Sequence, residues 1–222
     1  MEKLRLSLLA VIFGSVFFVL GRTILTPTAG NSSTVTSFVF PTAVPLPKWQ
    51  PTASRPLAAR ITESPDYPSG RLYQYIQNNL PLDIEMRYVA NTNGDVKYFI
   101  HQYSSTSPPP GQLSLVSRQQ EGVGFYNLFA YQQRAYLSSC INSRGGSTIT
   151  ESQFKLNRYT YDIQLSRLLG WALGQTNLVD GRCLWVHLSV PLKNSSPEDA
   201  YQTLEKVWFD WYQWWHPRFP QS

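Results

Sequence analysis

Charged side chains are scarce in this chain of 222 residues. They make up 15% of the sequence, whereas an average soluble protein has about 25%. Apolar residues reach 42% and aromatic residues 14%, which excludes an intrinsically disordered chain. The composition indicates a protein that lies outside the cytosol, near a membrane, or in contact with other molecules. It argues against a highly solvated cytosolic enzyme.

Runs of basic residues are also missing. The formal net charge is +5, but the first 30 residues hold three of the 19 basic and only one of the 14 acidic side chains. The rest of the chain therefore carries +3, spread along the sequence without a Lys/Arg cluster. Nucleic-acid binding requires a concentrated basic surface, so we expect no nucleic-acid partner.

The sequence contains no recognisable catalytic or metal-binding motif. Neither Gly-x-Ser-x-Gly nor His-Glu-x-x-His occurs, and the three histidines and two cysteines lack the spacing of a metal site. Gly145-Gly146 is not followed by the Lys-Ser/Thr of a phosphate-binding loop, and a hairpin turn is the favoured interpretation. We therefore expect no metal and no cofactor.

One long apolar stretch lies at the N-terminus. Residues 6–21 carry no charge, and residues 4–25 reach the length of a spanning helix if Arg5 and Arg22 extend to the two membrane interfaces. A cleaved signal peptide is the alternative, although no Ala-x-Ala cleavage site follows. Residues 1–25 are thus predicted to be a membrane anchor or signal. The basic start predicts a single-pass inner (plasma) membrane protein with its C-terminal domain on the exported, periplasmic side.

The next segment differs sharply in composition. Residues 26–37 are uncharged and rich in Ser and Thr, which is typical of a flexible stalk. Prolines then recur up to Pro56 and disfavour a helix or a central strand. We interpret residues 26–56 as a stalk and an extended arm, with Phe40, Leu46 and Trp49 lying across the surface of an exported domain of residues 57–222.

The domain is predicted to be α+β, with an antiparallel sheet and two main helices after the N-terminal transmembrane helix. Residues 82–91 alternate between apolar and polar, and the turn at 91–94 predicts a hairpin that returns over 95–103. Further strands are expected at 135–141 and 182–191. One helix is expected from Thr150 to Gly174, and another from Ser196-Pro197 to Pro217.

Cys140 and Cys183 are the only two thiols. In an oxidising compartment they would form a disulfide that closes a loop of about 43 residues and joins two strands. Two free structural thiols are a second interpretation. The third is a thiolate nucleophile with His187 or His101 as its base, which makes Cys140, Cys183 and His187 the catalytic candidates. His187 lies in an apolar strand, where a hydrogen-bonded structural histidine is favoured.

Four tryptophans gather near the C-terminus. Trp208, Trp211 and Trp215 have the spacing of a core-facing helical stripe. Trp214 falls outside that stripe and is expected to be exposed, where an indole can bind sugars or a membrane interface. Together with Arg144 and Arg182, it forms the candidate interaction surface.

Several segments resemble the cyanoexosortase A system-associated protein family of cyanobacteria. They include AYLSSCIN at 135–142, Arg144-Gly145, STIT at 147–150, Asp180-x-Arg182-Cys183-Leu184-Trp185, and YVANTNGD at 88–95. The single N-terminal anchor agrees with this resemblance, which covers about residues 40–220.

The resemblance implies a role beside an exosortase, an integral membrane cysteine transpeptidase that processes proteins with a C-terminal sorting tail. A wider accessory domain found in exopolysaccharide gene sets often has a His-x-Pro-x-x-Cys-Leu motif, but no His precedes Cys140 here, so no catalytic residue carries over. We expect a non-enzymatic accessory protein that binds the exosortase, its substrate or an exopolysaccharide. A thiol-dependent Cys–His enzyme acting on sorted proteins or surface polymers is the alternative.

Overall fold

The computed structural model describes residues 38–57, 69–104, 106, 108–109, 111–164, 167–168, 171, 178–192 and 196–220, together with residues 9, 11–16 and 18 near the N-terminus. The chain divides into two compact units, Met1–Thr36 and Ser37–Ser222. The second unit holds all of the described strands.

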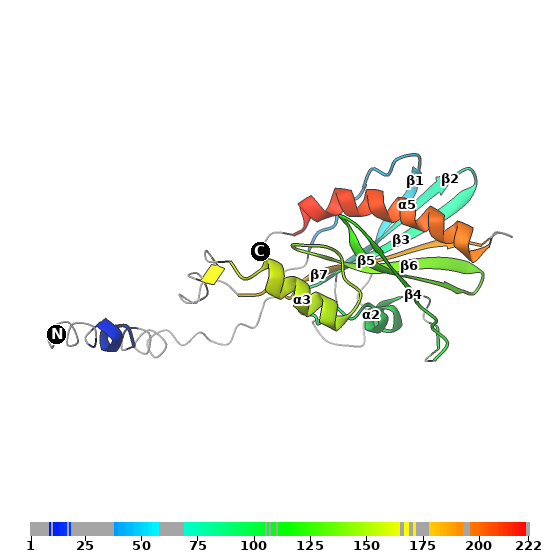
Figure 1. Cartoon of the computed structure of the whole chain (residues 1–222). Coiled ribbons are helices and arrows are strands. Elements are labelled where there is room, and N and C mark those ends of the chain that lie inside the picture. Colours follow the sequence, from blue (N-terminus) through cyan, green and yellow to red (C-terminus); the bar gives the residue numbers. More distant parts are fainter. Residues whose placement is uncertain are drawn as a thin grey trace. The chain divides into compact units, whose positions relative to one another are not determined.

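A seven-stranded antiparallel sheet forms the centre of this unit (Figure 1). Its strand order is β1-β2-β3-β7-β6-β5-β4. The late strand β7 therefore lies between β3 and β6, which come much earlier in the chain. The strands are β1 (Gln50–Leu57), β2 (Gly70–Gln77), β3 (Leu80–Val89), β4 (Val116–Gln120), β5 (Gly124–Tyr131), β6 (Arg134–Asn142) and β7 (Cys183–Pro191).

The strands expected from the sequence are present, and the sheet is larger than predicted. β3, β6 and β7 match the three strands predicted at 82–91, 135–141 and 182–191. The proline-containing β1 lies at one edge of the sheet. Proline has no N–H to donate to a neighbouring strand, so a strand that contains it is expected at an edge. β2 joins β3 through Asn78 and Asn79, which both have positive φ (49° and 59°), a turn geometry that asparagine tolerates.

The segment after the 91–94 turn is a helix, so the predicted return strand over 95–103 was wrong. α2 (Val96–Tyr103) begins at Asp95, whose carboxylate accepts hydrogen bonds from the backbone N–H groups of Lys97 and Tyr98. This is a strong N-cap. β3 pairs with β2 and β7 instead, which leaves no edge free for a return strand.

The two helix starts predicted from capping residues are confirmed. Thr150 caps α3 (Glu151–Tyr161), and Ser196 caps α5 (Pro197–Trp215), with Pro197 at its first position. α3 ends at Tyr161 rather than at Gly174, and most of residues 165–177 lie outside the described residues. α5 is followed by a short 3-10 turn, His216–Arg218.

The core has two layers, one on each face of the sheet. α5 covers one face, and α2 and α3 lie on the other (Figure 1). Alternation along the strands supplies both layers. On β7, for example, Leu184, Val186 and Leu188 face α5, whereas Cys183 and Trp185 face α2. The α+β class predicted from the sequence is therefore confirmed.

The Pro-rich arm is part of the α5-side core. Phe40, Val44, Leu46 and Trp49 are each at most 9% exposed. The rings of Phe38 and Phe40 contact Trp215 of α5, with centroid distances of 6.3 and 5.8 Å. The arm predicted to lie on the surface of the domain therefore also completes its core.

The predicted transmembrane helix falls mostly outside the described residues. Residues 9, 11–16 and 18 are helical. Across the parts of the chain that the structure describes, no helix has both the length and the apolarity needed to cross a membrane.

Candidate functional site

The two cysteines form a disulfide between the adjacent central strands β6 and β7. Cys140 and Cys183 are 43 residues apart in sequence, and their Cα atoms are 5.7 Å apart. Both side chains are fully buried. The disulfide predicted from the sequence is confirmed, and neither sulfur is available as a thiolate in this state.

His187 lies on the same face of β7 as Cys183 but packs among aromatic rings. Its imidazole stacks against Tyr136 and Trp185, with centroid distances of 5.2 and 5.3 Å. Its Nε2 lies 3.4 Å from the Ser104 hydroxyl oxygen. Burial, assisted by the positive charge of Arg134, lowers the pKa of His187 to about 3. The imidazole is therefore neutral at physiological pH and has the structural environment favoured from the sequence.

Ser104 and His187 do not form a catalytic pair of nucleophile and base. The Ser104 hydroxyl donates to the carbonyl of Thr106 (3.3 Å) and accepts from the Thr106 N–H (3.1 Å). Ser104 is only 4% exposed and His187 5% exposed. A nucleophile must be reachable by its substrate, and this arrangement shields the hydroxyl from solvent.

Arg144 and Arg182 are engaged in ion pairs with buried carboxylates. Arg144 contacts Asp162 at 2.9 Å, and Arg182 contacts Asp180 at 2.6 Å. Burial by itself would raise the pKa of Asp180, but hydrogen bonding and charge attraction from Arg182 outweigh it, so the pKa is lowered. Arg182 also donates to the Pro220 carbonyl. These contacts hold the loops beside β7 and the end of the chain in place.

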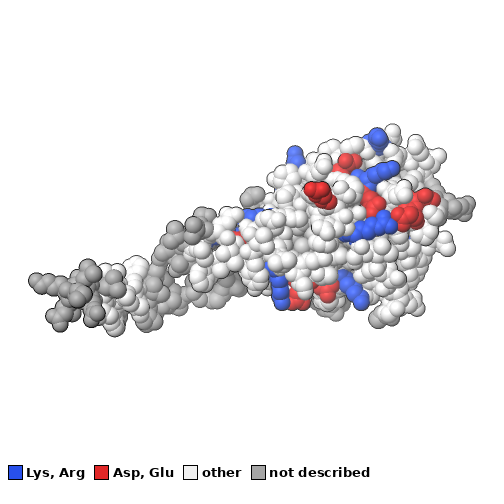
Figure 2. Space-filling view, in the orientation of Figure 1, with Lys and Arg blue, Asp and Glu red and all other residues white. Residues whose placement is uncertain are grey.

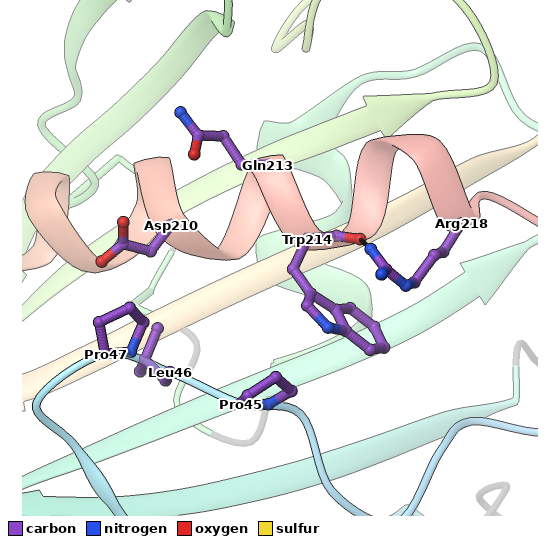
Figure 3. A pocket seen from close by; sticks show the side chains of 7 residues that line it. All are labelled: Pro45, Leu46, Pro47, Asp210, Gln213, Trp214 and Arg218. Carbon is purple, nitrogen blue, oxygen red and sulfur yellow. Dashed lines mark hydrogen bonds between the residues drawn. The ribbon is translucent and has the colours of Figure 1, made fainter.

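The buried stripe on α5 is confirmed, but Trp214, expected to be exposed, is partly buried and packs against the edge of the same core. Trp208, Trp211 and Trp215 are at most 1% exposed, whereas Trp214 is only partly buried. Trp214 lines a groove of about 490 Å³ between α5 and the arm (Figure 3). Of the three residues predicted to form an interaction surface, Trp214 is the one that lines this groove. The complete lining is Pro45, Leu46, Pro47, Asp210, Gln213, Trp214 and Arg218.

The arm forms one wall of the Trp214 groove, and buried tyrosines fix it. The hydroxyl of Tyr73 donates to the Pro41 carbonyl and that of Tyr75 to the Val44 carbonyl, each at 2.8 Å. Leu46 is buried, while its neighbours Pro45 and Pro47 are exposed. This wall is therefore apolar at its surface and anchored to the sheet behind it.

The end of α5 forms the opposite wall and carries the polar groups. The Arg218 guanidinium lies against the Trp214 indole, 4.7 Å from the ring centroid, and donates to the Trp214 carbonyl at 2.8 Å. Asp210 and Gln213 are exposed on the last turns of α5, with the Gln213 side chain pointing away from the arm (Figure 3). Within the described part of the chain, no hydrogen bond or ion pair engages either side chain.

Sequence reasoning identified Trp214 but missed the residues around it. Asp210, Gln213 and Trp214 have the i, i+3, i+4 spacing that places side chains on one helix face, and Arg218 follows one turn later. That pattern could have been found in the sequence. The contribution of Pro45 and Pro47 could not have been found in the sequence, because it depends on where the arm packs on the domain.

The charges elsewhere do not suggest a second site. Arg118 bridges Glu198 and Glu205 of α5, at 2.8 and 2.9 Å. On the face shown in Figure 2, acidic and basic side chains are mixed rather than gathered by sign. Among the described residues, no group of three or more His, Cys, Asp or Glu side chains could hold a metal ion.

The chain matches no family model, no curated protein and no solved structure. The resemblance to the cyanoexosortase A system-associated family therefore stays a prediction.

Proposed function

We propose that this chain is a non-enzymatic accessory protein of an exosortase-type protein-sorting system in a cyanobacterium. The N-terminal segment anchors it in the plasma membrane, and the α+β domain lies on the periplasmic side. There the domain binds the exosortase, its substrate or an exopolysaccharide. The Trp214 groove is the contact site.

The disulfide between Cys140 and Cys183 is the main observation that supports this proposal. A thiol enzyme needs a free thiolate and a base that can accept its proton. Here the only two cysteine sulfurs are bonded to each other inside the core. The histidine on the same strand is buried, with its pKa lowered to about 3 by burial. These observations favour binding over thiol catalysis. The disulfide also fits an oxidising compartment outside the cytosol.

The Trp214 groove is a second observation that supports a binding function. Most tryptophans of this chain are enclosed in its core, and an indole that remains partly exposed in a hollow beside unpaired polar side chains is typical of a contact site. The groove is largely open to solvent, which suits an extended partner better than an enclosed small molecule.

Counting reactive thiols tests the non-enzymatic part. The full chain is isolated with no reducing agent, denatured and titrated with a thiol reagent. We expect no reactive thiol before reduction and two afterwards. Two reactive thiols in the unreduced protein would favour the enzyme instead.

Capture of the membrane partner tests the accessory part. The full chain, tagged after Ser222, is cross-linked in the native membranes, and the captured proteins are identified by mass spectrometry. We expect an exosortase-type transpeptidase with the unaltered chain and with C140A/C183A, provided that this variant folds by circular dichroism. Capture that never yields an integral-membrane transpeptidase would contradict the accessory role.

A further inference from the structure

We propose that the Trp214 groove binds a neutral carbohydrate chain, with one sugar ring stacked on the Trp214 indole. This inference rests on the proposed function and names the ligand class of the same site. Three features of the groove carry it: its mixture of hydrogen-bonding groups, its balance of charge, and its rigid apolar wall.

The polar lining matches the chemistry of sugar hydroxyls. The Asp210 carboxylate can only accept hydrogen bonds, the Arg218 guanidinium can only donate them, and the Gln213 amide does both. A sugar hydroxyl also donates and accepts, so hydroxyls on successive rings of a sugar chain can pair with Asp210 and Arg218 on either side of Trp214. Figure 3 shows Trp214 between Asp210 of α5 and Arg218 of the following 3-10 turn, whereas the Gln213 amide points away from the arm.

The apolar lining matches the face of a sugar ring that carries C–H groups. A pyranose presents C–H groups on one face, and an indole offers a flat apolar surface with a polar edge. Trp214 projects from α5 toward Pro45 of the arm (Figure 3). Its position is held by the Arg218 guanidinium and by edge contact with Trp215, whose ring centroid is 4.9 Å away.

The balance of charge points to a neutral polymer. Asp210 and Arg218 give the lining one negative and one positive side chain. A polyanion such as a nucleic acid or a sulfated chain would be attracted to the Arg218 guanidinium. It would also lie close to the Asp210 carboxylate, which would repel it. A neutral chain can use both groups as hydrogen-bonding partners.

The size and rigidity of the groove also fit a carbohydrate chain as the ligand. The groove has a volume of about 490 Å³ and is largely open to solvent, so a chain that extends beyond it can be accommodated. Both walls are fixed before a ligand arrives: the arm by Tyr73 and Tyr75, and α5 by its buried tryptophans. Preformed walls reduce the ordering that binding requires.

A proline-rich peptide is the rival occupant. Domains that bind such peptides use grooves lined by several aromatic rings, between which the prolines insert. This groove has one aromatic ring, and two of its wall residues are themselves exposed prolines. The Asp210 carboxylate would also gain little from proline, which has no N–H to donate.

Direct titration tests the proposal. The full chain is purified in a zwitterionic detergent that contains no sugar, because alkyl glycosides would compete for the site. Isothermal titration calorimetry then measures binding to hexasaccharides of glucose, mannose, galactose and N-acetylglucosamine, and to a proline-rich peptide. We expect at least one hexasaccharide to bind and the peptide not to bind.

Four variants connect binding to the groove. W214A should weaken saccharide binding at least about tenfold, as removal of a central aromatic contact does, and W214F should recover part of the loss. D210A should weaken binding several-fold. W171A removes a half-exposed tryptophan that does not line the groove and should leave the affinity unchanged. Circular dichroism checks that each variant is folded.

Three outcomes would overturn the carbohydrate inference: no hexasaccharide binds, a folded W214A binds as tightly as the unaltered chain, or the peptide binds in a Trp214-dependent manner. None of them removes the accessory role, which the capture of a transpeptidase tests separately. Saccharide binding in a chain that never captures a transpeptidase would overturn only the accessory role.

Discussion

The hydroxyl of Tyr75 donates a 2.8 Å hydrogen bond to the backbone carbonyl of Val44, which lies 31 residues earlier in the chain. Both groups are buried, and burial raises the pKa of the Tyr75 hydroxyl, so it stays protonated and able to donate. This bond ties the arm to the sheet and fixes one wall of the Trp214 groove.

Y75F should therefore destabilise the domain. The Val44 carbonyl would be left buried without this partner, which costs about 1–3 kcal/mol. Urea denaturation of the unaltered chain and the variant measures the difference. Y98F, at a tyrosine that is 53% exposed, serves as the control and should change stability by less than about 0.5 kcal/mol. Equal effects of the two variants would contradict the role of Tyr75 in fixing the arm.

Removal of the disulfide should lower stability without unfolding the sheet. In the chain-entropy model, a bridge across 43 residues contributes about 4 kcal/mol. C140A/C183A should lose a large part of that amount, measured by urea denaturation beside the unreduced chain. Because both sulfurs are buried, the bridge should also resist a mild reductant until the domain is partly denatured. Rapid reduction of the native domain would argue against this burial.

His187 should make the stability of the domain depend on pH. Its pKa is about 3 in the folded chain and ordinarily about 6.5 in an unfolded one. Between these values the unfolded chain binds a proton that the folded chain does not, so stability falls as pH is lowered from 6.5 toward 3. The slope from this residue is about 1.4 kcal/mol per pH unit. Above pH 6.5 its contribution is complete and constant.

Comparison with H187Q isolates this effect, because the carboxylates titrate alike in both chains. Urea denaturation between pH 7.5 and 4.5 should show a steeper loss for the unaltered chain than for the variant. Parallel pH profiles would mean that His187 is accessible to protons in the folded state.

Two neighbouring tryptophans should differ strongly in their effect on folding. Trp211 is fully buried, and its ring contacts Tyr73 at a centroid distance of 5.3 Å, so W211A should cost about 3–5 kcal/mol. W214A removes a partly exposed ring and should cost much less. Thermal and urea denaturation of both variants measure this contrast. A similar loss for both would contradict the assignment of Trp214 to a binding surface rather than to the core.

Sequence patterns were reliable where one local interaction decides the structure. The helix starts at Thr150 and Ser196 depend on a side chain that accepts from an N–H three residues later, and this can be read from the sequence. The segment 95–103 was misjudged because its apolar residues fit both a strand and a helix. The Asp95 cap and the use of both β3 edges by other strands decided for the helix.

The sequence by itself determined the α+β class, the capped helix starts, and the separation of Trp214 from the buried stripe of α5, and it favoured the pairing of the only two cysteines. Each follows from spacing within one element or from the presence of a single partner. Only the tertiary structure decided that β7 inserts between β3 and β6, that His187 is neutral inside an aromatic stack, and that the arm faces Trp214 across a groove. These features require residues far apart in the chain to meet, and burial and long-range hydrogen bonds, rather than local periodicity, select which ones do.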